Sequence, residues 1–327
     1  MGWWRIGADS LASGRFVISP LTETVAALKT LHTARAGHPG ERAWLGTHLP
    51  GYRARLAADP LDALLVRTAI GRTWNADFLT PTPLGEGEAS FEDEVVAVRA
   101  TEPAAAVEQL ALSADGPVPE PLRTANDLPD RLARVLAWVW RETVLPDWPR
   151  RRRVLEADIA ARTARLARDG WATTLDELCP GRTRWLGEGR LQVNVRDHPP
   201  RSVDGGRLLL VPVTPANGWV SWAGNARFAL VYPCAGALAD DSAPAAPEAL
   251  RTLLGRGRAG VLVRLESPTS TSQLVALTGQ GLGSVGRHLK VLLDAGLVRR
   301  RRAGRSVLYD RTEAGTALVR AAGSGRP

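Results

Sequence analysis

The segment 282–309, LGSVGRHLKVLLDAGLVRRRRAGRSVLY, restricts the possible folds of this chain more than any other segment. Within it, Val285, Leu289, Leu292 and Leu293 recur at the spacing of one face of a helix. Because this pattern extends over 14 residues, a helix is predicted over 282–295. Its apolar face must pack against other elements, so the helix belongs to a folded domain and not to a solvated tail.

The residues after this helix predict a β-hairpin. Gly296 is the type of residue that commonly ends a helix. The runs 297–302 and 306–312 are typical of strands, and the small turn at 303–305 joins them. The first strand ends in four consecutive arginines, which makes the predicted hairpin strongly basic.

Shorter helical patterns surround this unit. They lie at 247–254, 261–265 and 273–278 before it, and at 313–322 after it. A turn at 279–281 separates the third pattern from the long helix. Two helices joined by a turn and followed by a basic hairpin form a winged helix–turn–helix. The second helix of such a unit enters the major groove of DNA, and the wing lies along the neighbouring backbone.

The predicted second helix has an exposed side that suits DNA. Projected at 100° per residue, the side opposite the apolar face carries small, polar and basic residues together with Val291. His288 lies at its edge, where it either contacts DNA or packs against the domain. The residues expected to bind DNA are Gly283, Ser284, Arg287, His288, Lys290, Arg299, Arg300, Arg301, Arg302 and Arg305. Arg287 is the best candidate for a guanine contact, and the wing arginines are expected to bind phosphates.

The segment 281–286, GLGSVG, also fits the G-x-G-x-x-G pattern of dinucleotide-binding loops. That pattern requires a buried strand immediately before the first glycine. Here the preceding residues, TSTSQLVALT, are polar and helical, and no further βαβ unit can follow before the chain ends. The glycines are therefore interpreted as a turn and as small residues on a helix that approaches DNA closely, and no cofactor is expected.

The charge distribution supports a polyanionic partner for the C-terminal region. From 248 onward there are 14 Arg and Lys against 5 Asp and Glu, a net charge of +9. The residues before 248 include 28 Arg and Lys against 29 Asp and Glu, a net charge of −1. A small basic domain on a neutral body is typical of a protein that binds double-stranded DNA.

The segment SVGRHLKVLLDAGLVRRRRAGRSVLY resembles the recognition helix and wing of ArsR-type transcriptional regulators, and the similarity extends over about 247–321. Members of that family usually have serines where this chain has Gly281 and Gly286. The metal-sensing members also carry a Cys-x-Cys in the preceding helix, which here reads TSQLVALTG, so no metal site is expected. The resemblance implies a homodimer that regulates transcription.

The N-terminal region predicts a helical domain with a small β-sheet. Helical patterns and start signals occur up to about 170, and strand-like runs such as RLLLVPV and ARFALVYP follow from about 183. We therefore predict an α+β, mainly helical fold with an N-terminal domain over 1–237, a linker over 238–246 and a winged helix–turn–helix over 247–327. Asp147 is expected to cap a helix whose arginines at 150–153 either contact phosphate or form a solvated face.

Residues 1–237 resemble a domain of unknown function that actinobacterial proteins often place ahead of this winged helix. This domain is expected to sense a signal, for which a small-molecule effector is one candidate, or to mediate dimerisation. Four tryptophans could line a ligand pocket, although ordinary core packing is the favoured explanation: Trp138, Trp140, Trp219 and Trp222.

Other chemistry finds little support in the sequence. The spacing of the histidines does not suit zinc binding, so no metal site is expected. Ser221 has no identifiable base, so no catalytic residue is expected. The chain has only two cysteines, Cys179 and Cys234, and no disulfide is expected between them. Neither a membrane span nor a secretory signal is recognisable, which indicates a cytoplasmic protein. The sequence favours a DNA-binding transcriptional regulator that acts as a repressor and is not an enzyme. The alternatives are a winged helix that binds protein and a DNA-tethered enzyme with an unrecognised active site.

Overall fold

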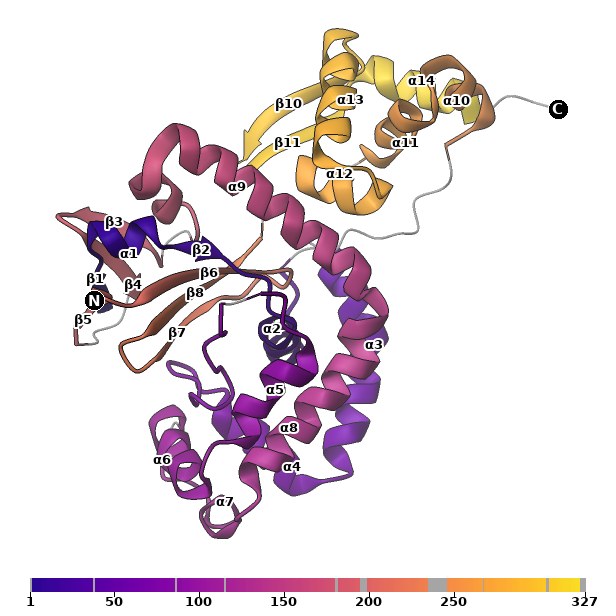
Figure 1. Ribbon diagram of the computed structural model, residues 1–327. Helices are drawn as coiled ribbons and strands as arrows, with labels where there is room; N and C mark the ends of the chain where they lie inside the picture. Colours follow the sequence, from indigo (N-terminus) through magenta and orange to yellow (C-terminus); the bar gives the residue numbers. More distant parts are fainter. Residues whose placement is uncertain are drawn as a thin grey trace.

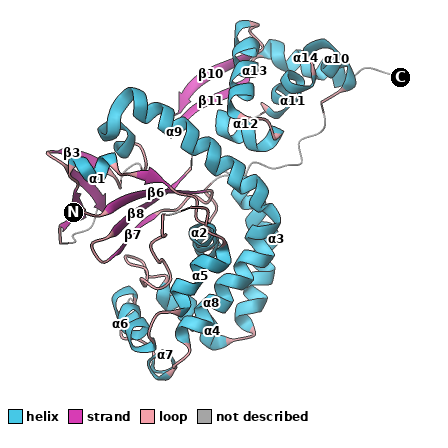
Figure 2. Cartoon of the chain, viewed as in Figure 1, coloured by secondary structure: helices cyan, strands magenta, loops and turns pink. Residues whose placement is uncertain are grey.

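The fold is mainly helical with small sheets, as Figure 1 and Figure 2 show, and the predicted α+β class is confirmed. The computed structural model describes residues 2–37, 39–85, 87–114, 116–179, 182–194, 199–234, 246–266, 268–303 and 306–323. No helix within these ranges is long and apolar enough to cross a membrane. The predicted linker 238–246 lies outside them except for Ala246, so the domain boundaries remain predictions.

The described N-terminal region has nine α-helices. They are α1 (Ala8–Ala12), α2 (Pro20–Thr33), α3 (Pro39–Ala57), α4 (Pro60–Ala69), α5 (Phe91–Arg99), α6 (Pro103–Ser113), α7 (Glu120–Thr124), α8 (Leu128–Val139) and α9 (Trp148–Asp176). The helices from α2 to α8 contribute buried residues to one large apolar core. A π-helical turn (Trp140–Val144) and a 3-10 turn (Leu145–Asp147) join α8 to α9.

The start signals in the sequence account for several helix ends. Ser19 Oγ accepts a hydrogen bond from the Thr22 amide at the start of α2, and Asp59 caps α4 in the same way. The prediction for Asp147 was wrong in one respect. Asp147 stands at the N-cap of α9, but its side chain makes no capping hydrogen bond. Helix α3 was not predicted, because Pro50 interrupts its pattern.

Two sheets, and not the single predicted one, complete the N-terminal region. In the first, β2 (Arg15–Phe16), β6 (Arg207–Val213), β8 (Arg227–Pro233) and β7 (Trp219–Ala223) lie in that order. In the second, the order is β3 (Arg184–Gly187), β4 (Arg190–Asn194), β1 (Gly2–Arg5) and β5 (Arg201–Ser202). The strands β1 and β2 are too short to show a periodic pattern, which explains why sequence reasoning missed both.

A buried ion pair links α9 to α2. Arg151 is fully buried, and its Nη1 lies 2.6 Å from Glu23 Oε1 and 3.0 Å from Thr214 Oγ1. The Thr214 amide also donates to Glu23 at 2.8 Å, and the Arg151 guanidinium lies 5.1 Å from the ring centre of Trp44. Both alternatives for the arginines at 150–153, phosphate contact or a solvated face, are therefore wrong for Arg151.

The C-terminal region contains the predicted order of elements. They are α10 (Glu248–Leu254), α11 (Arg256–Arg264), α12 (Thr271–Thr278), α13 (Leu282–Asp294), β10 (Val298–Ala303), β11 (Ser306–Arg311) and α14 (Glu313–Gly323). A short strand β9 (Thr269–Ser270), which was not predicted, pairs with β11 and gives the sheet order β10-β11-β9. These elements share a core that includes Leu262, Val285 and Leu289. Leu253 of α10 lies outside this core and is 66% exposed.

The two regions meet at α9, where α12 packs against the long helix (Figure 1). Ala157 of α9 is buried and belongs to the same apolar core as the residues of the winged helix. The helix α9 therefore contributes to the packing of both regions.

Glu94 of α5 predicts a pH dependence of stability. Burial raises its pKa to about 7, although Ser19 Oγ and the Leu21 amide donate to its Oε2, each at 2.9 Å. A carboxyl with a raised pKa in the folded state stabilises the fold at low pH, and this contribution disappears as the pH rises through 7. Between pH 5 and pH 8, the wild type should lose about 3 kcal/mol of unfolding free energy relative to Glu94→Gln.

Urea unfolding at several pH values measures this difference. The exposed Glu108→Gln serves as the control, and its profile should follow that of the wild type. Parallel profiles for Glu94→Gln and the wild type would contradict the assignment.

Candidate nucleic-acid interface

The first helix of the helix–turn–helix begins at a reciprocal cap. Ser270 Oγ accepts a hydrogen bond from the Gln273 amide at 3.2 Å, and Gln273 Oε1 accepts one from the Ser270 amide at 2.6 Å. This capping box fixes the start of α12. The Ser-x-x-Gln spacing in the sequence is the signal that could have revealed it.

The glycines between the helices form a turn, as predicted. Gly279 ends α12 with a φ of 65°, a conformation that favours glycine, and Gly281 is the N-cap of α13 without a side-chain cap. Gly283 and Gly286 lie inside α13. Because α12 and not a strand precedes Gly281, the G-x-G-x-x-G pattern does not form a dinucleotide-binding loop here.

The side of α13 opposite its apolar face, called the stripe below, is at the protein surface, as predicted. Gly283, Arg287 and Lys290 are exposed, and Val291 is 45% exposed. On the opposite side of the helix, Val285, Leu289 and Leu292 are buried in the C-terminal core. The stripe is therefore free to approach a groove of DNA.

Ser284 and His288 contact each other within the stripe. Ser284 Oγ lies 3.2 Å from His288 Nε2 and 3.3 Å from Gln280 Oε1. The His288 ring also packs over Gly257 of α11, where an added Cβ would come within 2.5 Å of Nε2. Partial burial, together with Arg258 and Arg287, lowers the pKa of His288. The packing interpretation therefore holds for the side of the ring that faces Gly257.

The wing places its arginines in different surroundings. Arg299 lies opposite Asp310 on β11, and its Nε and Nη2 each lie 2.8 Å from Asp310 Oδ2. This ion pair raises the pKa of Arg299 and offsets part of its charge. Arg300, Arg301 and Arg302 are exposed, without an ion pair within the described ranges. Arg305 and the rest of the turn lie outside those ranges.

Two glycines of this domain predict opposite effects of adding one methyl group. Gly286 is exposed inside α13, and an added Cβ would meet no atom within 4 Å. Gly286→Ala should therefore stabilise the domain by about 0.5–1 kcal/mol. Gly315 is buried in α14, and its Cβ would overlap the carbonyl oxygen of Leu297. Gly315→Ala should destabilise it by about 1–3 kcal/mol.

Hydrogen exchange of the α13 amides follows both changes, because exchange protection reports the local free energy of opening. Slower exchange in Gly286→Ala and faster exchange in Gly315→Ala is the expected result. The same direction in both variants would show that the packing around one of the two glycines is different.

The other candidates from the sequence are scattered. His32 and His48 lie on different helices, and His38 and His198 lie outside the described ranges. Three or more potential metal ligands do not gather anywhere in the part of the chain that is described. Ser221 accepts a hydrogen bond from Thr82 Oγ1 at 3.1 Å and is 7% exposed.

The four candidate tryptophans fulfil different roles. Trp140 is buried and lines a cavity together with Trp148, which the sequence did not single out. Trp219 lines a smaller cavity beside Trp74, and Trp222 packs on Trp74 with ring centres 5.4 Å apart. Trp138 packs partly buried against the N-terminal core, so packing and cavity lining both occur in this set.

Residues 262–300 match the model of a protein family described as bacterial regulatory protein, arsR family. This part of the chain is an ArsR-type helix–turn–helix domain. The match includes the end of α11, both helices of the motif and the start of β10. The match supports a DNA-binding transcription regulator, in which α13 is the second helix of the helix–turn–helix.

No curated protein and no solved structure matches the chain. The resemblance of residues 1–237 to the actinobacterial domain thus remains a prediction. The ArsR-type domain itself has glycine at 281 and 286, where serine is usual, and the structure leaves space for a side chain at both positions.

Proposed function

We propose that this regulator is a cytoplasmic repressor that binds its operator as a homodimer. Two ArsR-type domains would contact half-sites about one helical turn of double-stranded DNA apart. A dimer bound over a promoter blocks access of the polymerase without any further contact, so repression needs no additional activity from the N-terminal region. We propose a sensing or dimerising role for that region, and no catalytic one.

One observation supports the operator contact above all others. The stripe of α13 and the three wing arginines without ion pairs remain exposed in the whole described chain. The N-terminal region packs on α12, the other helix of the motif. Phosphate contacts by the wing and base contacts by the recognition helix are therefore sterically compatible with the packed N-terminal region.

Fluorescence anisotropy of the full-length chain on the DNA upstream of its own gene tests this function. Scrambled DNA of equal length is the control, and the salt concentration is varied. We expect a preference of about 10³-fold or more and a steep salt dependence. Equal binding to both DNAs, lost together at higher salt, would contradict operator recognition and indicate a protein partner for the winged helix.

Arg287→Ala tests the assigned base contact. Loss of a bidentate contact to guanine should weaken binding to the preferred DNA by about 1–3 kcal/mol and reduce its preference over variant sites. Arg141→Ala, an exposed arginine in the turn between α8 and α9, is the matched control and should change neither quantity. An unchanged affinity and base preference in Arg287→Ala would disprove the assignment.

A further inference from the structure

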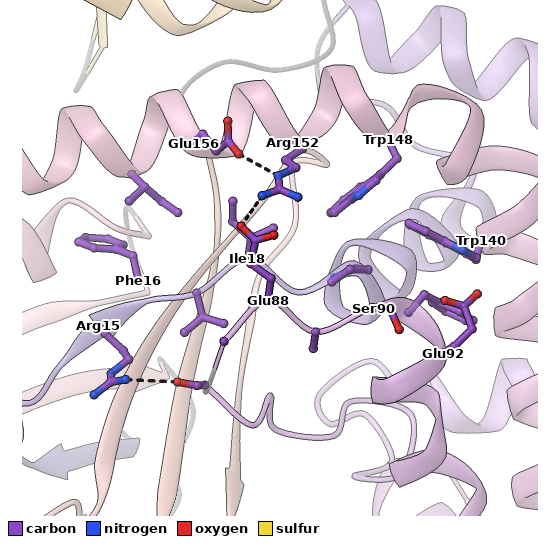
Figure 3. A pocket seen from close by; sticks show the side chains of 17 residues that line it. Arg15, Phe16, Ile18, Glu88, Ser90, Glu92, Trp140, Trp148, Arg152 and Glu156 are labelled. Carbon is purple, nitrogen blue, oxygen red and sulfur yellow. Dashed lines mark hydrogen bonds and ion pairs between the residues drawn. The ribbon is translucent and has the colours of Figure 1, made fainter.

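A cavity of about 640 Å³ lies between α9, the start of α5 and the segment from β2 to α2 (Figure 3). Its volume falls within the range of sites for small organic molecules. Its walls come from segments that are distant in sequence, near 15–20, 85–92, 140–148 and 152–159. For that reason no local pattern in the sequence marks it.

One side of the cavity is aromatic. The Trp140 ring stacks on Phe91 with ring centres 5.2 Å apart and planes 5° apart, and Trp148 meets Trp140 edge-on at 5.3 Å. Phe16 and Ile159, which are only half-buried, add apolar surface. Aromatic faces attract both apolar groups and organic cations.

Among the described residues that line the cavity, there is one more carboxylate than guanidinium. Arg152 is already held between two acids, with Nε 2.8 Å from Glu156 and Nη2 2.5 Å from Glu88. Arg15 donates to the carbonyl oxygen of Gly85 at 3.4 Å. Glu92, in the first turn of α5, is exposed and has no hydrogen bond or ion pair to any described residue.

This arrangement discriminates between ligand charges. An anion would have to replace the carboxylates that already bind Arg152. A cation would find the excess negative charge and an aromatic wall in the same space. We propose that this cavity binds a hydrophobic organic cation, and that its occupancy changes the DNA affinity of the winged helix. The second part rests on the proposed function.

The connection to DNA binding runs through α9. Arg152, Glu156 and Ile159 line the cavity from this helix. Ala157, the residue next to Glu156, belongs to the core of the winged helix, and α12 packs on the same helix. A ligand that shifts or fixes α9 therefore acts directly on the helix against which the DNA-binding domain packs.

Calorimetric titration of the full-length chain with tetraphenylphosphonium and tetraphenylborate tests the site, because these ions have similar shape and opposite charge. We expect binding of the phosphonium only, and about tenfold weaker binding to Glu92→Gln. Glu108→Gln on α6 makes the same charge change away from the cavity and should bind like the wild type. Binding of neither ion, equal binding of both, or equal affinity in Glu92→Gln would overturn the site.

Anisotropy with preferred DNA in the presence of tetraphenylphosphonium tests the transmission. We expect at least about a fivefold change in DNA affinity for the wild type and a smaller one for Glu92→Gln at the same ligand concentration. Binding of the phosphonium without a change in DNA affinity would overturn transmission through α9. Failure of the chain to prefer any DNA would refute the proposed function, while the calorimetric result for the cavity would stand.

Discussion

Arg151→Met is expected to lower the free energy of unfolding of the N-terminal region by about 3–5 kcal/mol. The physical reason is the Glu23 carboxylate, which is fully buried and would lose the guanidinium 2.6 Å away. Thr214 alone cannot compensate a charge in this surrounding, because a hydroxyl and an amide carry no net charge. Removing one partner of a buried ion pair leaves the other without compensation.

Urea unfolding followed by tryptophan fluorescence measures this loss, since all eleven tryptophans precede 223 and report on the N-terminal region. Arg153→Met is the matched control, because Arg153 is exposed on the same helix and its replacement should change stability by less than about 0.5 kcal/mol. In the double variant Arg151→Met/Glu23→Gln, part of the lost stability should return, because no buried charge remains. Equal unfolding midpoints for Arg151→Met and Arg153→Met would show that the buried pair does not exist.

Replacement of Arg300, Arg301 and Arg302 by glutamine together is the second change with a large expected effect. Each phosphate contact contributes about 0.9 to the slope of log affinity against log salt. If all three arginines contact phosphate, the slope should become less steep by about 2.7, and binding should weaken on preferred and scrambled DNA alike. Arg299 is left in place, because its charge is partly offset by Asp310.

Anisotropy over a salt series on both DNAs measures the two slopes. The matched control replaces three exposed arginines of the N-terminal region by glutamine, which changes the net charge equally: Arg42, Arg53 and Arg141. The control should keep the wild-type slope. A control that loses as much slope as the wing variant would mean that total charge, and not the wing, determines affinity.

The winged helix was predictable because its determinants are local. The spacing of Val285, Leu289 and Leu292 defines the buried face of α13. Gly296, which has a positive φ, directly follows the C-cap of this helix. The two strand-like runs and the short segment between them also predict the hairpin, although not its register. The exposure of Gly283, Arg287 and Lys290 follows from the same periodicity, since these side chains lie opposite the buried face.

Other features of this domain depend on contacts across it. The pairing of Arg299 with Asp310 requires the register of the hairpin, and the packing of His288 on Gly257 requires the position of α11. Neither partner is marked by a pattern in the sequence. The strand β9 is only two residues long, and its Ser270 pairs with Leu308 of β11, which is distant in the chain.

The sequence by itself determined the class of the fold, the winged helix and its basic surface. These depend on hydrogen bonds and apolar periodicities that span a few residues. Only the tertiary structure decided that Arg151 is buried, since its partner Glu23 is 128 positions away. The same holds for the cavity beside α9, whose walls come from four separate segments. Burial is a property of what packs on a residue, and in this protein the packing partners are distant in the chain.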